Sequence, residues 1–169
     1  MTVSLFTFVD LYRRQLDAAA HLLAKGQAHA ASAGISEADM LNWRLIEDMN
    51  PLGFQLMVVI NFSRQWTARV AGLPEQPGVE ANIDAAAFHA AIADAKAFLA
   101  GLTPAHFEGR DDIPFTYKII EGMEPTLPSG QWLTVFAATN IYFHASAAYA
   151  ILRAKGVPLG KADMFASGL

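Results

Sequence analysis

The sequence predicts an all-α protein, an up-down four-helix bundle with a short extra helix and a small β-hairpin before the last long helix. Over four long segments, apolar residues recur at spacings of three, four and seven, the period of a helix with one buried face. Hydrophobic residues make up 53% of the chain, and many are alanine, the best helix former. Between 110 and 128 the period changes to the alternation typical of strands.

Length and composition limit the classes of protein. The 169 residues fit one domain, 1–169. The net charge is −4 with no acidic or basic block, which argues against nucleic-acid binding. The absence of cysteine excludes disulfides and thiolate metal sites. Because no positively charged region precedes the apolar Val3–Val9 run, we expect no secretory signal and a cytoplasmic location.

The segment Ser129–Gly156 organises the predicted bundle. We expect one long helix that begins at Ser129 as its cap, ends at Gly156 and is covered by the other helices. Residues 132–152 contain no Asp, Glu, Lys or Arg and are long enough to cross a bilayer. Polar residues such as Asn140 and His144 inside this stretch favour a core helix, so we expect no membrane span.

The preceding helices have recognisable boundaries. A first helix is expected over 3–30, and Ser36 with Asp39 forms a capping-box-like start for a short helix. A second long helix is expected over 51–71, with Asn50 as its cap and Pro51 as its first residue. The third, over 85–101, has Asp84 as its cap.

Two further segments complete the predicted fold. Phe115, Tyr117 and Ile119 alternate with Thr116, Lys118 and Ile120 and predict one strand of a hairpin, with 124–127 pairing back as an edge strand. The C-terminal tail is expected to lie on the surface of the bundle, anchored by Leu159 and Phe165.

Asn140 and His144 are the strongest candidates for an interior site. They lie at positions i and i+4 of the organising helix and so share one face. A buried polar group without a partner costs about 1–3 kcal/mol, so each needs one. Two interpretations remain open: a small ligand or metal inside the bundle, or a core histidine hydrogen-bonded to a neighbouring carboxylate or carbonyl.

Three other residues are candidates for the same site. Asp48 precedes the second long helix and is the expected partner of His144, unless it only caps that helix. Asn61 lies in an apolar run and either binds ligand or makes an inter-helix hydrogen bond. Tyr142 either lines a pocket or packs. The other histidines show no metal-ligand spacing, and no phosphate loop or nucleophile motif occurs.

The end of the chain carries a long motif, and two shorter ones precede it. An aromatic-Tyr-Phe-His run leads through Ala-Tyr-x-Ile-Leu-Arg to Gly-Val-x-Leu-Gly-Lys-x-Asp, after an Asp-Met-x-Pro-Leu run and a Phe-x-Gly segment. These positions are Asp48, Met49, Pro51, Leu52, Phe107, Gly109, Tyr142, Phe143, His144, Ala148, Tyr149, Ile151, Leu152, Arg153, Gly156, Val157, Leu159, Gly160, Lys161 and Asp163. In these motifs the chain resembles the DUF1993 family of uncharacterised bacterial proteins.

This resemblance implies a bundle of the DinB/YfiT-like type, in which several relatives bind a divalent metal through three histidines. Some relatives are thiol-dependent transferases or isomerases. One hypothesis is therefore a bundle whose polar interior is structural or binds a small molecule. The other is a divergent metal-dependent enzyme with His144 and Asp48 as ligands of zinc or nickel. A homodimer acting through apolar helix faces is a third expectation.

Overall fold

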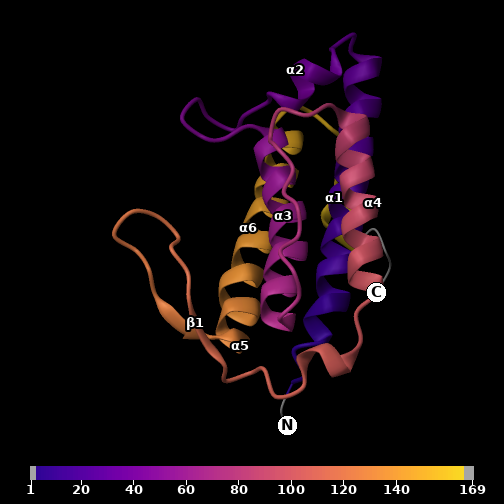
Figure 1. Cartoon of the computed structure of the whole chain (residues 1–169). Helices are drawn as coiled ribbons and strands as arrows, with labels where there is room; N and C mark the ends of the chain where they lie inside the picture. The colour runs from indigo at the N-terminus through magenta and orange to yellow at the C-terminus, as the bar shows by residue number, and fades with distance from the viewer. Residues whose placement is uncertain (1–2, 166–169) are drawn as a thin grey trace.

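The computed structural model describes residues 3–165 as an up-down bundle, which confirms the predicted fold class (Figure 1). Its long helices are α1 (Thr7–Ser32), α3 (Leu52–Ala71), α4 (Ala85–Ala100) and a continuous last helix. The last helix consists of α5 (Ser129–Gln131), the π-helix η2 (Trp132–Ala137) and α6 (Ala138–Ala154). Helix α3 packs on α6 and α4, and α1 packs on α6 and α4.

All but one of the shorter elements lie at the two ends of the bundle, and the last of them, at the C-terminus, packs against the side of α1. The shorter elements are α2 (Glu37–Leu41), η1 (Pro104–Phe107), η3 (Lys161–Phe165) and the antiparallel strands β1 (Pro114–Thr116) and β2 (Thr126–Pro128). In the hairpin Phe115 is opposite Leu127, and an isolated bridge joins Ile120 to Met123. The hairpin is confirmed, although its strands are shorter than the alternating pattern indicated.

Two of the predicted helix caps are confirmed and two are wrong. Ser36 Oγ accepts from the Asp39 amide, and Asp84 Oδ1 accepts from Ala87 N at 2.7 Å. At α3, Pro51 rather than Asn50 occupies the cap position. At α5, Pro128 is the cap and Ser129 is already helical, with its hydroxyl donating to the Ile113 carbonyl at 2.8 Å. Ser129 therefore ties the last helix to the segment before β1.

The last helix differs from the expected core helix because one of its faces is open. Its inner face is fully buried at residues such as Leu133, Ile141 and Ile151, whereas Val135 and Phe143 are each 60% exposed. Ser129–Ala154 is long and apolar enough to cross a membrane by length and composition, and 39% of its apolar 18-residue stretch is buried inside the bundle. The other helices thus cover only part of this helix.

The π-helix η2 lies near the start of this helix. Its six residues run without a break into α6, and the Ala138 backbone N–H donates to the Leu133 carbonyl five residues earlier. The same carbonyl accepts the hydroxyl of the fully buried Tyr12 from α1. Burial raises the pKa of this phenol, so Tyr12 remains a neutral donor that joins α1 to the π-helix.

An aromatic cluster attaches the hairpin to this end of the bundle. The Trp66 and Trp132 rings stack with centroids 5.0 Å apart, and Trp132 Nε1 donates to the Phe115 carbonyl at 3.0 Å. The Arg69 guanidinium lies over the Tyr117 ring, 4.8 Å from its centroid, and over Trp66 at 5.1 Å. Strand β1 is thereby held against both α3 and the last helix.

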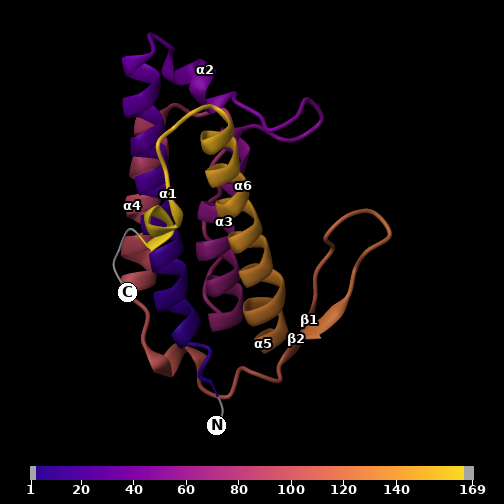
Figure 2. The same ribbon diagram turned by 180° about the vertical axis from the view of Figure 1, so that it is seen from behind.

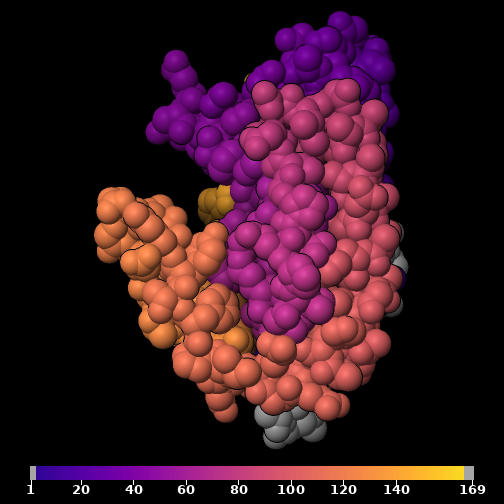
Figure 3. Space-filling view, viewed as in Figure 1, coloured from indigo at the N-terminus to yellow at the C-terminus, as the bar shows by residue number. Residues whose placement is uncertain are grey.

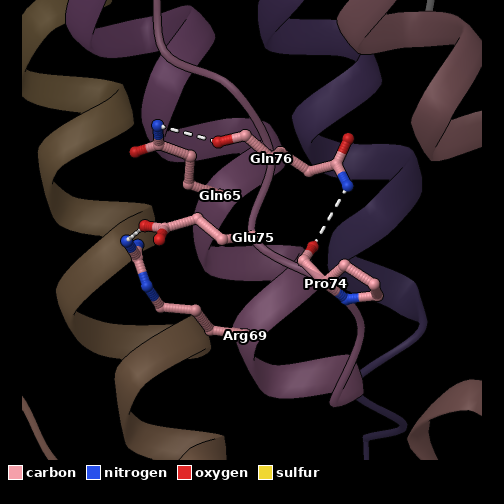
Figure 4. A network of polar contacts seen from close by, with 5 residues as sticks. All are labelled: Gln65, Arg69, Pro74, Glu75 and Gln76. Carbon is pink, nitrogen blue, oxygen red and sulfur yellow. Dashed lines mark hydrogen bonds and ion pairs between the residues drawn. The ribbon is translucent and has the colours of Figure 1, made fainter.

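The segment between α3 and α4 is a strap that runs back along α3. Asn61, Gln65 and Arg69, one turn apart on α3, bind Val79, Gln76 and Glu75 respectively. The order of partners is reversed along the chain, so the strap is antiparallel to the helix. Figure 4 shows the Gln65–Gln76 and Arg69–Glu75 contacts. These three side chains support the segment against α3.

The C-terminal tail returns to α1, as Figure 2 shows. Leu159 is buried as predicted, but Phe165 is 46% exposed and does not anchor the tail. Instead Asp163 Oδ1 lies 2.7 Å from Nε2 of His21 on α1. A hydrogen bond from the Gly160 amide, followed by the bond to His21, lowers the pKa of the Asp163 carboxyl.

Candidate functional site

The most distinctive polar pair in the bundle joins α3 to α6. His144 on α6 and Gln55 on α3 lie 2.7 Å apart between Nδ1 and Oε1. Gln55 is 2% exposed and His144 is half-buried. Because α3 and α6 pack closely along their length, they bring together two residues that are distant in the sequence.

The hydrogen bonds of Gln55 fix the protonation pattern of His144. The Gln55 Nε2 group donates to the Asn50 carbonyl at 2.9 Å, so its Oε1 must be the atom that faces the imidazole. An amide oxygen only accepts, and therefore Nδ1 of His144 carries the proton. In the neutral ring Nε2 is then an acceptor with a free lone pair.

The surroundings of His144 favour that neutral form. Burial lowers the pKa of His144. The Phe54 ring lies edge-on at 5.9 Å and the Phe143 ring at 5.1 Å between centroids. Within residues 3–165, Nε2 of His144 has no hydrogen-bond partner, and this atom is not buried. The ring thus offers a solvent-accessible lone pair beside two aromatic side chains.

Asn140 lies one turn before His144 and lines a groove beside the hairpin. Its Nδ2 donates to the Phe136 carbonyl at 2.8 Å, which leaves its Oδ1 available as an acceptor. The groove, which has a volume of about 260 Å³, lies between β2 and the outer face of the last helix. Its lining is mostly apolar and consists of Leu127, Gln131, Val135, Phe136, Thr139 and Asn140.

The remaining predicted site residues lie elsewhere. Asp48 is exposed in the loop before α3 and makes no hydrogen bond or ion pair among the described residues, so the partner of His144 is Gln55 and not Asp48. Asn61 uses its amide for the strap, donating to the Val79 carbonyl and accepting from the Val79 amide. Tyr142 is 42% exposed on the outer face of α6.

The predicted ligands His144 and Asp48 do not form a metal centre with other described side chains. Among residues 3–165, no three His, Asp or Glu side chains are grouped so that they could hold a metal ion. His144 is the one predicted ligand that lies in the interior polar pair, and its Nδ1 faces an amide. The pair His144 and Asp48 does not come together with a third ligand in the described part of the chain.

Gln55 is the site residue that sequence reasoning missed. One signal was available, because Gln55 is the first amide after Pro51 in a run that is otherwise apolar as far as Ile60. A buried amide must find partners, and the buried surface of α6 offers few polar groups besides His144. The pattern could indicate that Gln55 needs a partner, but not which one.

Comparison with known proteins gives a family and a fold. A family model described as "Domain of unknown function (DUF1993)" matches residues 6–165. Among solved structures, a DinB family member protein from Shewanella denitrificans is similar, with 26% identity and a TM-score of 0.83 over 95% of this chain and 91% of that one. No curated protein sequence matches the chain.

Proposed function

The chain belongs to the DUF1993 family of unknown function and has a DinB-like fold, and from this premise we propose that it binds a small organic molecule along the outer face of α6. The observation that carries the proposal is the oriented, neutral imidazole of His144. Its Nδ1 proton is held by Gln55, and its Nε2 lone pair has no protein partner in the described chain.

The chemistry of the groove specifies the class of ligand. Asn140 Oδ1 in the groove and His144 Nε2, one helical turn beyond the residues that line it, are both acceptors, so a ligand that reaches both supplies O–H or N–H donors. The apolar lining at Leu127, Val135 and Phe136 favours a ring or short hydrocarbon part. A volume of about 260 Å³ limits the ligand to a small molecule of this kind. A phenol combines these properties and is a suitable probe.

The same imidazole would serve as a general base if the bound molecule were acidic enough. A neutral histidine with one nitrogen fixed and the other free is the arrangement that proton transfer requires. A catalytic role for His144 would require that the small molecule binds beside it. The other candidate function is a metal-dependent enzyme of the DinB type. No three His, Asp or Glu side chains within residues 3–165 are grouped so that they could hold a metal ion, so this function is considered as an outcome of the test below.

A titration observed by NMR tests the binding proposal. Phenol is added to the ¹⁵N-labelled protein, and the imidazole nitrogens of His144 are followed. We expect saturable binding in the millimolar range that moves the Nε2 signal and weakens at least 10-fold in His144→Ala. The matched control is His106→Ala, which removes a histidine from η1, outside the groove and away from His144, and it should leave binding unchanged.

Two outcomes would overturn this proposal. The first is the absence of a saturable shift, or equal binding by His144→Ala. The second is stoichiometric zinc or nickel binding that raises the melting temperature of the wild type and is lost in His144→Ala. The second outcome would favour the metalloprotein hypothesis.

A further inference from the structure

Seven large apolar side chains are exposed on the last helix and on two segments beside it. Two lie in the loop between α2 and α3, two at the hairpin tip and three on the outer face of the last helix. They form what we name the open face: Leu45, Ile46, Ile120, Met123, Val135, Tyr142 and Phe143. Exposed apolar residues scattered singly need no explanation, but a group gathered on one side does.

The open face is concave. In Figures 1 and 2 the loop before α3 and the hairpin both project on the side of α6, at opposite ends of that helix. Figure 3 shows them as two protrusions with a notch between them, in which α6 is visible. A partner that contacts α6 would therefore also contact both protrusions.

The exposed area is large enough for a dimer. The seven side chains are between 42% and 60% exposed. Taking about 150–200 Å² as the full surface of one large side chain, they leave roughly 600 Å² of apolar surface on this face. That area is about three quarters of the roughly 800 Å² that each partner buries in a standard interface.

The charges at the rim favour protein over lipid. The two protrusions carry two basic residues, Arg44 and Lys118, and four acidic residues, Glu47, Asp48, Glu121 and Glu124. Anionic membrane surfaces attract clusters of Lys and Arg, and this rim has an excess of acid. An apolar centre with a polar, mixed-charge rim is the usual anatomy of a protein interface.

We propose that the open face is the interface of a homodimer, with a second copy of this chain as its occupant. A two-fold axis through the face would bring the same patch of each protomer against its partner, protrusions included. The proposal does not depend on ligand binding. If both hold, the second copy would cover the groove and His144, which would place the ligand between the protomers.

Sedimentation equilibrium of the full chain without ligand tests the dimer. Phe143→Lys introduces a charge at the centre of the face, twice per dimer, and we expect the dissociation constant to rise about 100-fold. Ile46→Lys, in a loop, should weaken the dimer in the same direction without altering a helix. The matched control is Phe165→Lys, because Phe165 is also a half-exposed phenylalanine but lies in η3 against α1, and it should leave the dimer intact.

Three results would overturn the proposal. One is a wild-type protein that stays monomeric at about 100 μM. Another is a dimer that Phe143→Lys and Ile46→Lys do not weaken, because a different face would then be used. The third is a monomer that sediments with phosphatidylserine vesicles, which would make lipid the occupant. Phenol titration of the monomeric Ile46→Lys variant tests the ligand site separately.

Discussion

His144 Nδ1 and Gln55 Oε1 lie 2.7 Å apart although 89 positions separate the two residues in sequence. This hydrogen bond joins α3 to α6 at a point where both helices are otherwise apolar. Gln55 is in turn held by the Asn50 carbonyl, so a backbone group before α3 sets the protonation of an imidazole on α6. Four predictions follow from this pair and from the supports around it.

Replacement of Gln55 by Leu should change the tautomer of His144. The Asn50 carbonyl and the Nδ1 proton both lose their partner, so we expect a loss of about 1–2 kcal/mol in the free energy of unfolding by urea. Long-range ¹H–¹⁵N spectra should show Nδ1 losing its proton to Nε2. The matched control is Gln65→Leu, since Gln65 is on the same helix but contacts the strap. An unchanged tautomer in Gln55→Leu would contradict the assignment.

His144 should make the protein less stable as the pH falls. Its pKa is lowered by burial, so the unfolded chain takes up a proton near pH 6.5, where the folded protein does not. Stability from this residue is present above about pH 6.5 and is lost as the pH falls toward the folded pKa. In His144→Gln the difference in unfolding free energy between pH 7.5 and 5.5 should be smaller. An equal difference in both proteins would refute the prediction.

Asn61→Ala should loosen the strap. Asn61 is the one supporting side chain that both donates to and accepts from the Val79 backbone, at 3.0 and 2.9 Å. We expect a loss of about 1–2 kcal/mol and faster hydrogen exchange at the Val79 amide. Asn61→Asp keeps the acceptor for that amide but not the donor, so its exchange should be intermediate. Full protection of Val79 in Asn61→Ala would count against this role.

Arg69→Ala should weaken the attachment of the hairpin. The Arg69 guanidinium contacts Glu75 of the strap and the rings of Tyr117 and Trp66. Cation–π contacts contribute about 0.5–1 kcal/mol each at exposed sites, so we expect a loss of about 1–2 kcal/mol and a change in tryptophan fluorescence. Arg69→Lys should recover only part of this lost stability, because lysine lacks the planar guanidinium. A hairpin with unchanged hydrogen exchange in Arg69→Ala would exclude this contribution.

The parts of the fold that the sequence predicted correctly are those marked by local signals, such as helix caps. Ser36 and Asp84 cap their helices through contacts three residues away, and Gly72 and Gly156 follow α3 and α6 with φ of 68° and 88°. Such positive angles favour glycine. Errors arose where a distant segment competed for a polar group. Ser129 bonds to Ile113 rather than capping its own helix, and no local pattern contains Ile113.

The candidate site was predicted only in part for the same reason. Periodicity placed Asn140 and His144 on one face of one helix. It did not show which residues of α3 lie opposite them. Asp48 lies in the loop before α3 and Gln55 in the first turn of that helix, and the position of α3 along α6 decides which of them meets His144. That position depends on packing along the whole bundle, including the aromatic cluster at its far end.

The π-helix η2 has a consequence for mutational tolerance. A π-helical turn contains about one residue more than an α-helical turn, so η2 absorbs an extra residue between Trp132 in the aromatic cluster and His144 opposite Gln55. Deleting one residue between 132 and 137 should convert η2 to α-helix with both contacts kept in phase. The same deletion between 145 and 150 should rotate all later side chains by about 100°. The last helix can therefore lose a residue within η2 without a change in the direction of the side chains that follow.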